Sequence, residues 1–447
     1  MQRSAIGKPA SGWVQCALAG LMALGLSACG GGGDDPPAKA WQTSWATAPT
    51  GPASLSNTEL FLPLITLDKQ TVRLIVRSNV AGSQIRIRLS NEIGDAPAAL
   101  EIGAAHVAVR DKGSSIVSGT DRTLTFGGKR DVVIPAKGMV YSDPVDLSVA
   151  AMSDLAISLY LPKKTVVQSA HFVTRQNSYL NPGNESAAVA LSAAVPTSSW
   201  FVATGLDVMS SKPMTLVAYG DSITDGFGDS SMRTDAPTPW PSWPSRLADR
   251  VAAASNLAGL SVVNAGISGN RLMSDAPNLG NSDAALRARA VYGPKGVSRF
   301  QRDVVEQRGA SCVVILQGIN DIGIGAMEGK PVTSAQITAA YQQMIAQARG
   351  AGMKVIGATL LPFAGYAAPY YSAGNNAIRE SVNQWIRTSG AYDAVIDFDA
   401  IVRDPGNPLQ MQAQYDSGDH LHPNDVGYKA MADGIDLSML QQLCVKS

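Results

Sequence analysis

Four polar segments, each following a short apolar run, contain the side chains that could carry chemistry. They are GDSITDG with Ser222, NAGISGN with Gly269, QGIND with Asn320, and DHLHPND with Asp419 and His422. A serine at a strand-to-helix turn can act as a nucleophile, although it can also cap the helix. Glycine N–H groups and asparagine amides can stabilise a negatively charged oxygen, and a carboxylate can orient an imidazole base. Together these residue types suit nucleophilic acyl transfer, whereas each alone is also typical of a turn.

The last segment holds His420 and His422, the only histidines in the C-terminal half of the chain. In an extended loop the ring of His420 would point away from its neighbour Asp419. A single turn through Leu421 would instead bring His422 back to that carboxylate. Pro423 favours this arrangement because it keeps the preceding residue out of the helical region and is suited to open a helix. We therefore expect His422 to be the base, and His420 to be a partly buried, hydrogen-bonding structural residue.

A metal site is the alternative use of this segment, because two histidines lie close to Asp419 and Asp425. A zinc site would need three or four ligands from His, Cys or acidic residues. No other histidine follows His171, and no further acidic cluster is spaced like a ligand set. We therefore expect no metal and no other cofactor.

The elements that must position these segments are strands and helices in alternation. Apolar runs predict strands at 215–219, 261–264, 312–316, 354–361 and 394–398. Helical spacing of apolar residues lies between them, in sets that begin at Trp243, Ile337 and Ile378. Continuous apolar strands alternating with helices indicate a doubly wound parallel sheet covered on both faces. Ligands of such sheets bind at the carboxyl ends of the strands, where the four polar segments lie.

A different pattern precedes this region. At 71–77 and 84–89 apolar and polar residues alternate, which is typical of half-buried strands, and glycines recur at short intervals. The pattern predicts an all-β sandwich over residues 41–209, followed by the α/β domain over 214–445. A chain of 447 residues is long enough for two separate cores.

The motif set GDS, a later glycine, GxND and DxxH, in this order after successive strands, resembles that of the SGNH (GDSL) hydrolase superfamily. The resemblance covers residues 214–445 and implies a flavodoxin-like doubly wound fold. It implies Ser222 as nucleophile, His422 as general base and Asp419 as the carboxylate that orients the base. Ile223 replaces the leucine of the GDSL label, at a position with no chemical role.

The same resemblance implies an oxyanion hole made by the N–H groups of Ser222 and Gly269 and the side-chain amide of Asn320. With an N-terminal sandwich, TLVAYGDSITDG and ATLLPF, the chain looks like the branch that contains arylesterases and carbohydrate acetylesterases. This implies a serine esterase acting on short-chain acyl or acetyl esters of carbohydrates or aryl alcohols. The alternative is a polysaccharide-binding surface protein with a secondary acyl-transfer activity.

Two segments are candidates for lining the site, residues 271–296 and the turn at 240–243. Trp243 belongs to a helical apolar pattern and is expected in the core. Trp240 stands among prolines and could be a surface plug or a platform on which a sugar stacks.

The N-terminus has the layout of a secretory signal, with Arg3 and Lys8 before an apolar run at 13–26. The alternative is a spanning helix, but residues 14–28 are fewer than the ~20 that cross a bilayer. The sequence LSAC at 26–29 resembles the lipobox of bacterial lipoproteins, which implies removal of residues 1–28 and acylation of Cys29. Residues 29–40 would then be a flexible tether. Gly30 stands where some lipoproteins have an aspartate that retains them in the inner membrane, so the resemblance suggests the outer membrane.

Charge and cysteine content limit the remaining partners. The chain has 36 Lys and Arg against 36 Asp and Glu, so no positive field would attract nucleic acid. Partners are expected to be an ester substrate and, through Cys29, a lipid bilayer. Cys312 lies in the apolar run CVVIL, which favours a small buried hydrophobic residue over one half of a disulfide.

Overall fold

The computed structural model describes residues 39–51, 66–93, 98–172, 174–228, 240–275 and 292–445. Residues Ala38–Ser447 form one compact unit. The predicted signal at 1–28, the lipidation site Cys29 and most of the predicted tether lie outside the described residues, as does part of the segment 271–296. Within the described residues, no helix has both the length and the apolar character needed to cross a membrane.

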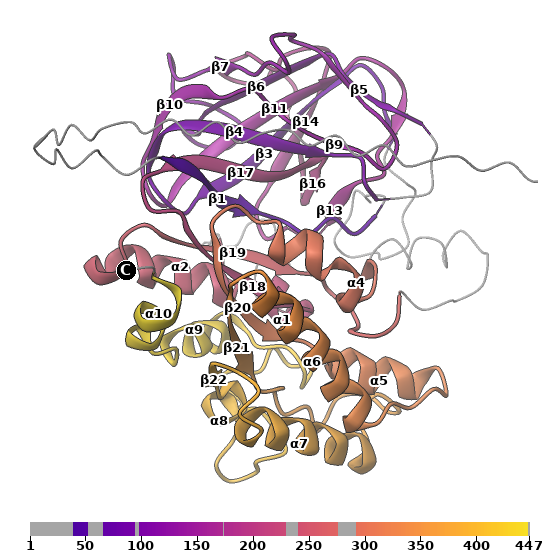
Figure 1. Cartoon of the computed structure of the whole chain (residues 1–447). Helices are drawn as coiled ribbons and strands as arrows, with labels where there is room; N and C mark the ends of the chain where they lie inside the picture. The colour runs from indigo at the N-terminus through magenta and orange to yellow at the C-terminus, as the bar shows by residue number, and fades with distance from the viewer. Residues whose placement is uncertain are drawn as a thin grey trace, which may run out of the picture. The chain divides into compact units, whose positions relative to one another are not determined.

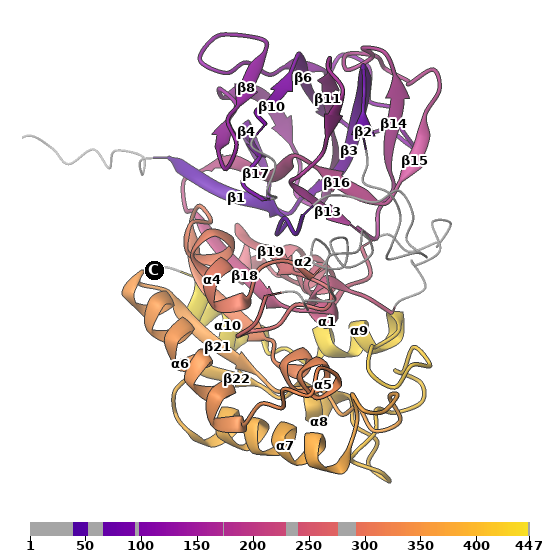
Figure 2. The same ribbon diagram turned by 90° about the vertical axis from the view of Figure 1, so that its right-hand side faces the viewer.

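The C-terminal part is built on a parallel sheet of five strands in the order β19-β18-β20-β21-β22 (Figures 1 and 2). The strands are β18 (Met214–Gly220), β19 (Leu260–Gly266), β20 (Ala310–Leu316), β21 (Lys354–Ala358) and β22 (Ala394–Ile396). All five predicted strands are present, in the flavodoxin-like order. β21 ends before the predicted position because the backbone N–H and C=O of Leu360 bind the side-chain amide of Asn383 instead of a neighbouring strand.

Helices cover both faces of this sheet, with α2, α9 and α10 on one face and α4 and α6 on the other (Figure 1). The helices are α1 (Ser222–Asp225), α2 (Trp243–Ala253), α4 (Gly296–Phe300), α5 (Ile319–Met327), α6 (Ser334–Gly350), α7 (Ala373–Thr388), α8 (Phe398–Val402), α9 (Asp425–Asp433) and α10 (Leu437–Cys444), with a 3₁₀ turn at Ser255–Leu257 and a π turn at Gln301–Val305. The helical patterns that begin at Trp243, Ile337 and Ile378 form α2, α6 and α7. Their apolar faces pack into the core of the sheet, and Trp243 is fully buried, as predicted.

The helix after the DHLH segment begins differently from the prediction. Asn424 caps α9 by accepting hydrogen bonds from the backbone N–H groups of Val426 and Gly427, each over 3.0 Å. Pro423 therefore lies just before the cap and does not open the helix itself. Its role in keeping His422 outside the helix is compatible with this position.

The expectation that Cys312 is only a small buried hydrophobic residue was wrong. Cys312 is buried in β20, but it forms a disulfide with Cys444 at the end of α10, with Cα atoms 5.4 Å apart. α10 packs against β20 and also places the carbonyl of Cys444 2.8 Å from the Ser311 hydroxyl. The partners are 132 residues apart, and no local spacing indicates which helix returns to the strand.

The N-terminal region is rich in strands and forms antiparallel sheets. One sheet has the order β1-β17-β4-β10, with β9 also paired to β4, and another has the order β15-β14-β3-β11-β6-β7. Small two-stranded sheets pair β2 with β12, β5 with β8, and β13 with β16. The strands are β1 (Ala40–Ala46), β2 (Thr66–Leu67), β3 (Gln70–Ser78), β4 (Gly82–Ser90), β5 (Leu100–Ile102), β6 (Ala104–Val109), β7 (Arg122–Thr123), β8 (Val132–Ile134), β9 (Met139–Tyr141), β10 (Val145–Val149), β11 (Ser153–Leu161), β12 (Thr165–Val166), β13 (Ala170–Phe172), β14 (Ser178–Pro182), β15 (Val195–Thr197), β16 (Ser199–Phe201) and β17 (Ala203–Ser210).

Apolar side chains from both large sheets share one core, a packing compatible with the predicted sandwich. The predicted strands at 71–77 and 84–89 lie within β3 and β4. β3 is not half-buried as predicted, because Arg73 on its other face is also buried. The Arg73 guanidinium donates to the Ser158 hydroxyl over 2.8 Å and to the carbonyls of Ser114 and Ala188 over 2.7 Å each. The division into domains at 41–209 and 214–445 stays a prediction.

The disulfide gives a stability prediction. We expect Cys444→Ala to lower the free energy of unfolding by roughly 2–5 kcal/mol, because the bond closes a long loop in the unfolded chain. Urea unfolding at neutral pH measures this effect. Adding a reductant should destabilise the wild type to the level of the variant and leave the variant unchanged; equal stability of the oxidised wild type and the variant would contradict the expectation.

Candidate active site

The serine of GDSITDG stands at the carboxyl end of β18, where α1 begins. The residue that caps α1 is Asp221, whose Oδ1 accepts a hydrogen bond from the N–H of Ile223 over 3.1 Å. Ser222 is therefore not the capping residue, which settles the alternative left open by the sequence. Its hydroxyl lies 2.9 Å from Nε2 of His422 and is buried.

His422 connects this hydroxyl to a carboxylate. Its Nδ1 lies 2.6 Å from Oδ2 of Asp419, and the other oxygen of Asp419 accepts the backbone N–H groups of Leu421 and His422 over 2.9 and 2.8 Å. A carboxylate can only accept, so Nδ1 carries the hydrogen and Nε2 of the neutral ring is free to accept from Ser222. The single turn expected between Asp419 and His422 is therefore present.

The Asp419 carboxyl is held in its ionised form. Partial burial raises its pKa, but the hydrogen bond and positive charge available from His422, with the two backbone N–H groups, outweigh burial and hold the pKa well below the usual value. A carboxylate in this state can both fix the tautomer of His422 and stabilise a positive charge on the ring.

Two residues that the sequence did not single out shape the surroundings of His422. The ring of Phe227 packs against the imidazole, with centroids 4.8 Å apart, and the Phe227 carbonyl accepts from the Tyr428 hydroxyl over 2.6 Å. Gly228 lies so close that a Cβ there would come within 2.4 Å of the His422 Cβ. The glycine directly after GDSITDGF is the sequence signal for this close approach.

His420 takes no part in this line of contacts. Its Nδ1 lies 2.7 Å from Oδ2 of Asp416, and its side chain is 49% exposed. It is hydrogen-bonded, as predicted, but more exposed than predicted. Its backbone is left-handed, with φ of 65°.

The three groups expected to form an oxyanion hole follow three adjacent strands, with Ser222 and Asn320 at the beginnings of α1 and α5 and Gly269 on the loop after β19. Gly220 at the end of β18 is in register with Gly266 of β19 and Leu316 of β20. Among the described residues, the backbone N–H groups of Ser222 and Gly269 donate to no acceptor. Gly269 has φ of 74°, and a Cβ there would overlap the ring of Tyr292, so the loop requires glycine.

The side chain of Asn320 is held at both ends. Its Oδ1 accepts from the Tyr370 hydroxyl over 2.9 Å, and its Nδ2 donates to the Asn270 carbonyl over 3.1 Å. One hydrogen of the amide nitrogen remains for a ligand. The Asn270 carbonyl can only accept and therefore fixes which end of the amide is the donor. Tyr370 holds the other end, and its contribution was not apparent from the sequence.

Two buried carboxyl groups support these loops. Burial raises the pKa of Asp221 to about 7, with a smaller contribution from the negative charge of Asp321. Burial raises the pKa of Asp321 to about 6, although its oxygens accept from the N–H groups of Leu272 and Met273 over 2.7 and 3.0 Å. Asp321 thus anchors the beginning of the segment 271–296, of which residues 276–291 lie outside the described residues.

Trp240 does not line the site as either alternative required. It is 6% exposed, its ring stacks on Trp200 with centroids 6.0 Å apart, and the guanidinium of Arg77 lies 5.2 Å from its ring centroid. Trp240 therefore belongs to the core of the N-terminal strands. It is neither a surface plug nor an exposed platform for a sugar.

A five-stranded parallel sheet of this order, with a serine, a histidine and an aspartate in hydrogen-bond contact at its carboxyl edge, is an SGNH hydrolase fold. Residues 218–430 match the GDSL-like Lipase/Acylhydrolase family. We therefore identify this part of the chain as a domain of that family, and the protein as a carboxylic ester hydrolase.

Solved structures similar to the chain include three hydrolases. A GDSL-like lipase from Bacteroides thetaiotaomicron VPI-5482 is 19% identical over 52% of this chain and 89% of that chain, with a TM-score of 0.35. An inhibitor-bound aryl esterase from M. smegmatis is 17% identical over 52% and 99%, with a TM-score of 0.37. A carbohydrate acetylesterase from Sinorhizobium meliloti is 15% identical over 49% and 94%, with a TM-score of 0.35. No curated protein matches the chain.

Proposed function

We propose that the protein hydrolyses carboxylic esters through an acyl-enzyme on Ser222, with His422 as general base and Asp419 as its orienting carboxylate. The observation that carries the proposal is the unbroken line of hydrogen bonds from the Ser222 hydroxyl through the His422 ring to Asp419. This line combines a nucleophile, a base and a group that orients the base, as acyl transfer requires.

In the first step, Oγ of Ser222 attacks the ester carbonyl while its proton moves to Nε2 of His422. The carbonyl π electrons move onto oxygen, and their return expels the alcohol, which takes the proton from His422. Water then repeats these steps on the acyl-enzyme and releases the free acid. Asp419 stabilises the imidazolium formed at each stage, and no cofactor is needed.

The charge that develops on the carbonyl oxygen would be stabilised by three donors, the N–H groups of Ser222 and Gly269 and the amide of Asn320. Support comes from the two N–H groups, which have no acceptor within the described part of the chain, and from the Asn270 carbonyl and the Tyr370 hydroxyl, which orient the amide. Donors fixed before the reaction need no reorganisation as the charge forms, and loss of one typically costs about 10²–10³ in rate.

The two histidines of DHLHPND test the proposed base. We expect His422→Ala to lower kcat by at least about 10⁴ with little change in KM, as removal of a triad base does. His420→Ala, the matched control two residues away, should stay within roughly tenfold of the wild type. Steady-state kinetics on p-nitrophenyl acetate measure both, and circular dichroism checks folding. A well-folded His422→Ala protein with near-normal kcat would refute the assignment.

For the substrate, we propose short-chain acyl or acetyl esters of carbohydrates or aryl alcohols. Beyond the N-terminal apolar run, the sequence has no long apolar stretch or apolar lid helix that would indicate a deep tunnel for a fatty acyl chain. The resemblance to arylesterases and carbohydrate acetylesterases favours the same choice.

A series of p-nitrophenyl esters from acetyl to palmitoyl, together with acetylated xylan, tests this choice. We expect kcat/KM to be highest for acetyl or butyryl esters and to fall for longer chains, because a shallow site gains no contact from added methylenes. Ser222→Ala measured in parallel gives the uncatalysed background. Faster turnover of palmitoyl than of acetyl and butyryl esters would rule out the short-chain proposal.

For location, we propose that acylated Cys29 anchors the protein to a lipid bilayer, with the outer membrane favoured by Gly30. A multiply acylated cysteine would hold the chain stably, whereas one acyl chain binds only marginally. We expect Cys29→Ser to move the protein from the membrane to the soluble fraction, as followed by immunoblotting of fractions. Cys16→Ser is a matched control that should leave membrane association unchanged. Continued membrane association of Cys29→Ser would contradict the lipobox interpretation.

A further inference from the structure

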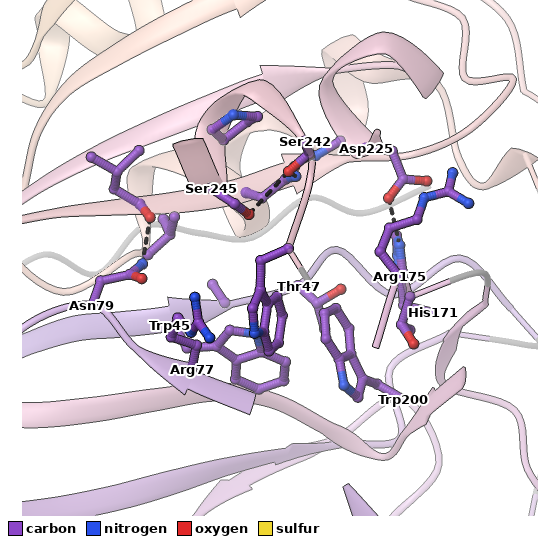
Figure 3. A pocket seen from close by; sticks show the side chains of 18 of the residues that line it. Trp45, Thr47, Arg77, Asn79, His171, Arg175, Trp200, Asp225, Ser242 and Ser245 are labelled. Atoms are coloured by element: carbon purple, nitrogen blue, oxygen red, sulfur yellow. Dashed lines mark hydrogen bonds and ion pairs between the residues drawn. The ribbon is translucent and has the colours of Figure 1, made fainter. Parts of the chain in front are cut away.

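The N-terminal strands place a histidine directly against α1, the short helix that begins with Ser222. His171 lies on β13 and is buried, and its Nε2 lies 3.0 Å from Oδ1 of Asp225, the last residue of α1 (Figure 3). Its Nδ1 lies 2.8 Å from the carbonyl oxygen of Ala48. This contact involves none of the residues that the proposed mechanism uses.

The geometry assigns a positive charge to the His171 ring. A carbonyl oxygen can only accept, so Nδ1 carries a hydrogen. The other oxygen of Asp225 accepts both the N–H and the hydroxyl of Ser268, and these donors stabilise the ionised carboxylate, which can only accept. Nε2 therefore carries a hydrogen as well, and the ring is an imidazolium paired with a buried carboxylate.

The electrostatics agree with this geometry. Burial lowers the pKa of His171, but the charge and hydrogen bond of Asp225 outweigh it and raise the pKa above 6.5, while Arg175 opposes the rise. Burial raises the pKa of Asp225, but His171, with Arg175 and Ser268, brings it below 3.8. Among the described residues, Asp225 and Arg175 are the charged groups that face His171. The pair therefore contributes its full stabilisation of the folded state between pH 3.8 and 6.5. This contribution is lost as the pH rises through the raised pKa of His171, and also as the pH falls through the lowered pKa of Asp225.

Asp225, which contacts His171, also binds Ser268 in the loop after β19. Its Oδ2 accepts the Ser268 N–H over 3.1 Å and the Ser268 hydroxyl over 2.6 Å. The backbone and the side chain of Ser268 are thus both held, and the next peptide nitrogen is that of Gly269. The direction of the Gly269 N–H depends on how the peptide unit between these two residues is oriented.

α1 packs so closely against the end of β19 that the two segments have little freedom to move relative to each other. A Cβ on Gly266 would come within 2.3 Å of the Asp225 nitrogen, and the Asn264 amide donates to the Thr224 carbonyl over 2.8 Å. A change in the position of Asp225 would therefore move the end of β19 and the residues that follow it, up to Asn270.

We propose that His171, supplied by the N-terminal strands as an imidazolium, is a positioning residue for the esterase site. It holds Asp225, Asp225 holds Ser268, and Ser268 sets the direction of the Gly269 N–H toward the oxyanion. This inference rests on the proposed function, because it assigns the Gly269 N–H to the oxyanion hole. In this proposal the N-terminal strands contribute to catalysis by supplying the residue that positions an oxyanion donor.

His171→Gln in the full-length chain tests the proposal. Glutamine can still donate to Asp225 but carries no charge. We expect kcat on p-nitrophenyl acetate to fall roughly 10- to 100-fold, less than complete loss of a donor, with KM little changed. His106→Gln is the matched control, because His106 on β6 also pairs with an aspartate, Asp121, over 2.9 Å. That variant should keep wild-type kinetics.

Two further measurements separate positioning from a general structural role. A trifluoromethyl ketone forms a tetrahedral adduct with the nucleophile, so its Ki should rise by the factor by which kcat/KM falls. In the wild type, kcat should also decline as the pH rises through the raised pKa of His171, and His171→Gln should lack this decline. Wild-type kcat and Ki in His171→Gln, or the same alkaline decline in both proteins, would overturn the proposal.

Ser268→Ala provides a second variant if His171→Gln does not fold. It keeps the charge pair and removes only the hydroxyl contact to Asp225, so a smaller loss in kcat with a matching rise in Ki is expected, and unchanged values would overturn the proposal.

Ser222→Ala separates a failure of the proposed esterase function from a failure of the proposed role of His171. If it keeps esterase activity, the proposed function itself fails. If it is inactive while His171→Gln and Ser268→Ala are normal, only the positioning role fails.

Discussion

The buried guanidinium of Arg299 holds the strand ends from which the loops of the site depart. Arg299 is fully buried in α4, where an unpaired charge would be very costly. It donates to the carbonyls of Gly220 and Ala265, over 2.7 and 2.8 Å, at the ends of β18 and β19. It also pairs with Asp303 over 3.0 Å and lies over the ring of Tyr219. Since each contact helps to satisfy the same charge, the two strand ends and α4 must keep one arrangement.

Asn270 extends this constraint to the third loop. Its Oδ1 accepts from Nε of Arg299 over 2.9 Å and from the Gln317 amide over 2.5 Å. Its backbone carbonyl accepts from the side chain of Asn320. The segments that follow β18, β19 and β20, which contain the proposed nucleophile and oxyanion donors, are therefore connected through one arginine and one asparagine.

What could be predicted from the sequence depended on local patterns. The five parallel strands are continuous apolar runs, and Asp419 lies three residues from His422, so a single turn could be inferred. The contacts that were missed connect distant segments. Arg299 and Gly220 are 79 residues apart, His171 and Asp225 are 54 apart, and the disulfide partners are 132 apart. Such pairings follow from the packed fold, and no period or spacing in the sequence encodes them. β3 shows a related limit of sequence patterns. Its alternation of apolar and polar residues predicted a solvent-exposed face, but the polar residue Arg73 is buried.

Asp221 and Ser222 have different roles because the N–H groups at the start of α1 need hydrogen-bond acceptors. The first N–H groups of any helix have no intrahelical acceptor and must find another partner. Asp221 takes the N–H of Ile223, so the hydroxyl of Ser222 is not needed for capping and is free to contact His422. The N–H of Ser222 has no acceptor in the described part of the chain and is one of the free donors at the start of the helix. If that donor binds the oxyanion as proposed, the beginning of α1 supplies both the nucleophile and part of its charge stabilisation. The cost is a buried carboxyl whose pKa is raised to about 7, next to the reacting serine.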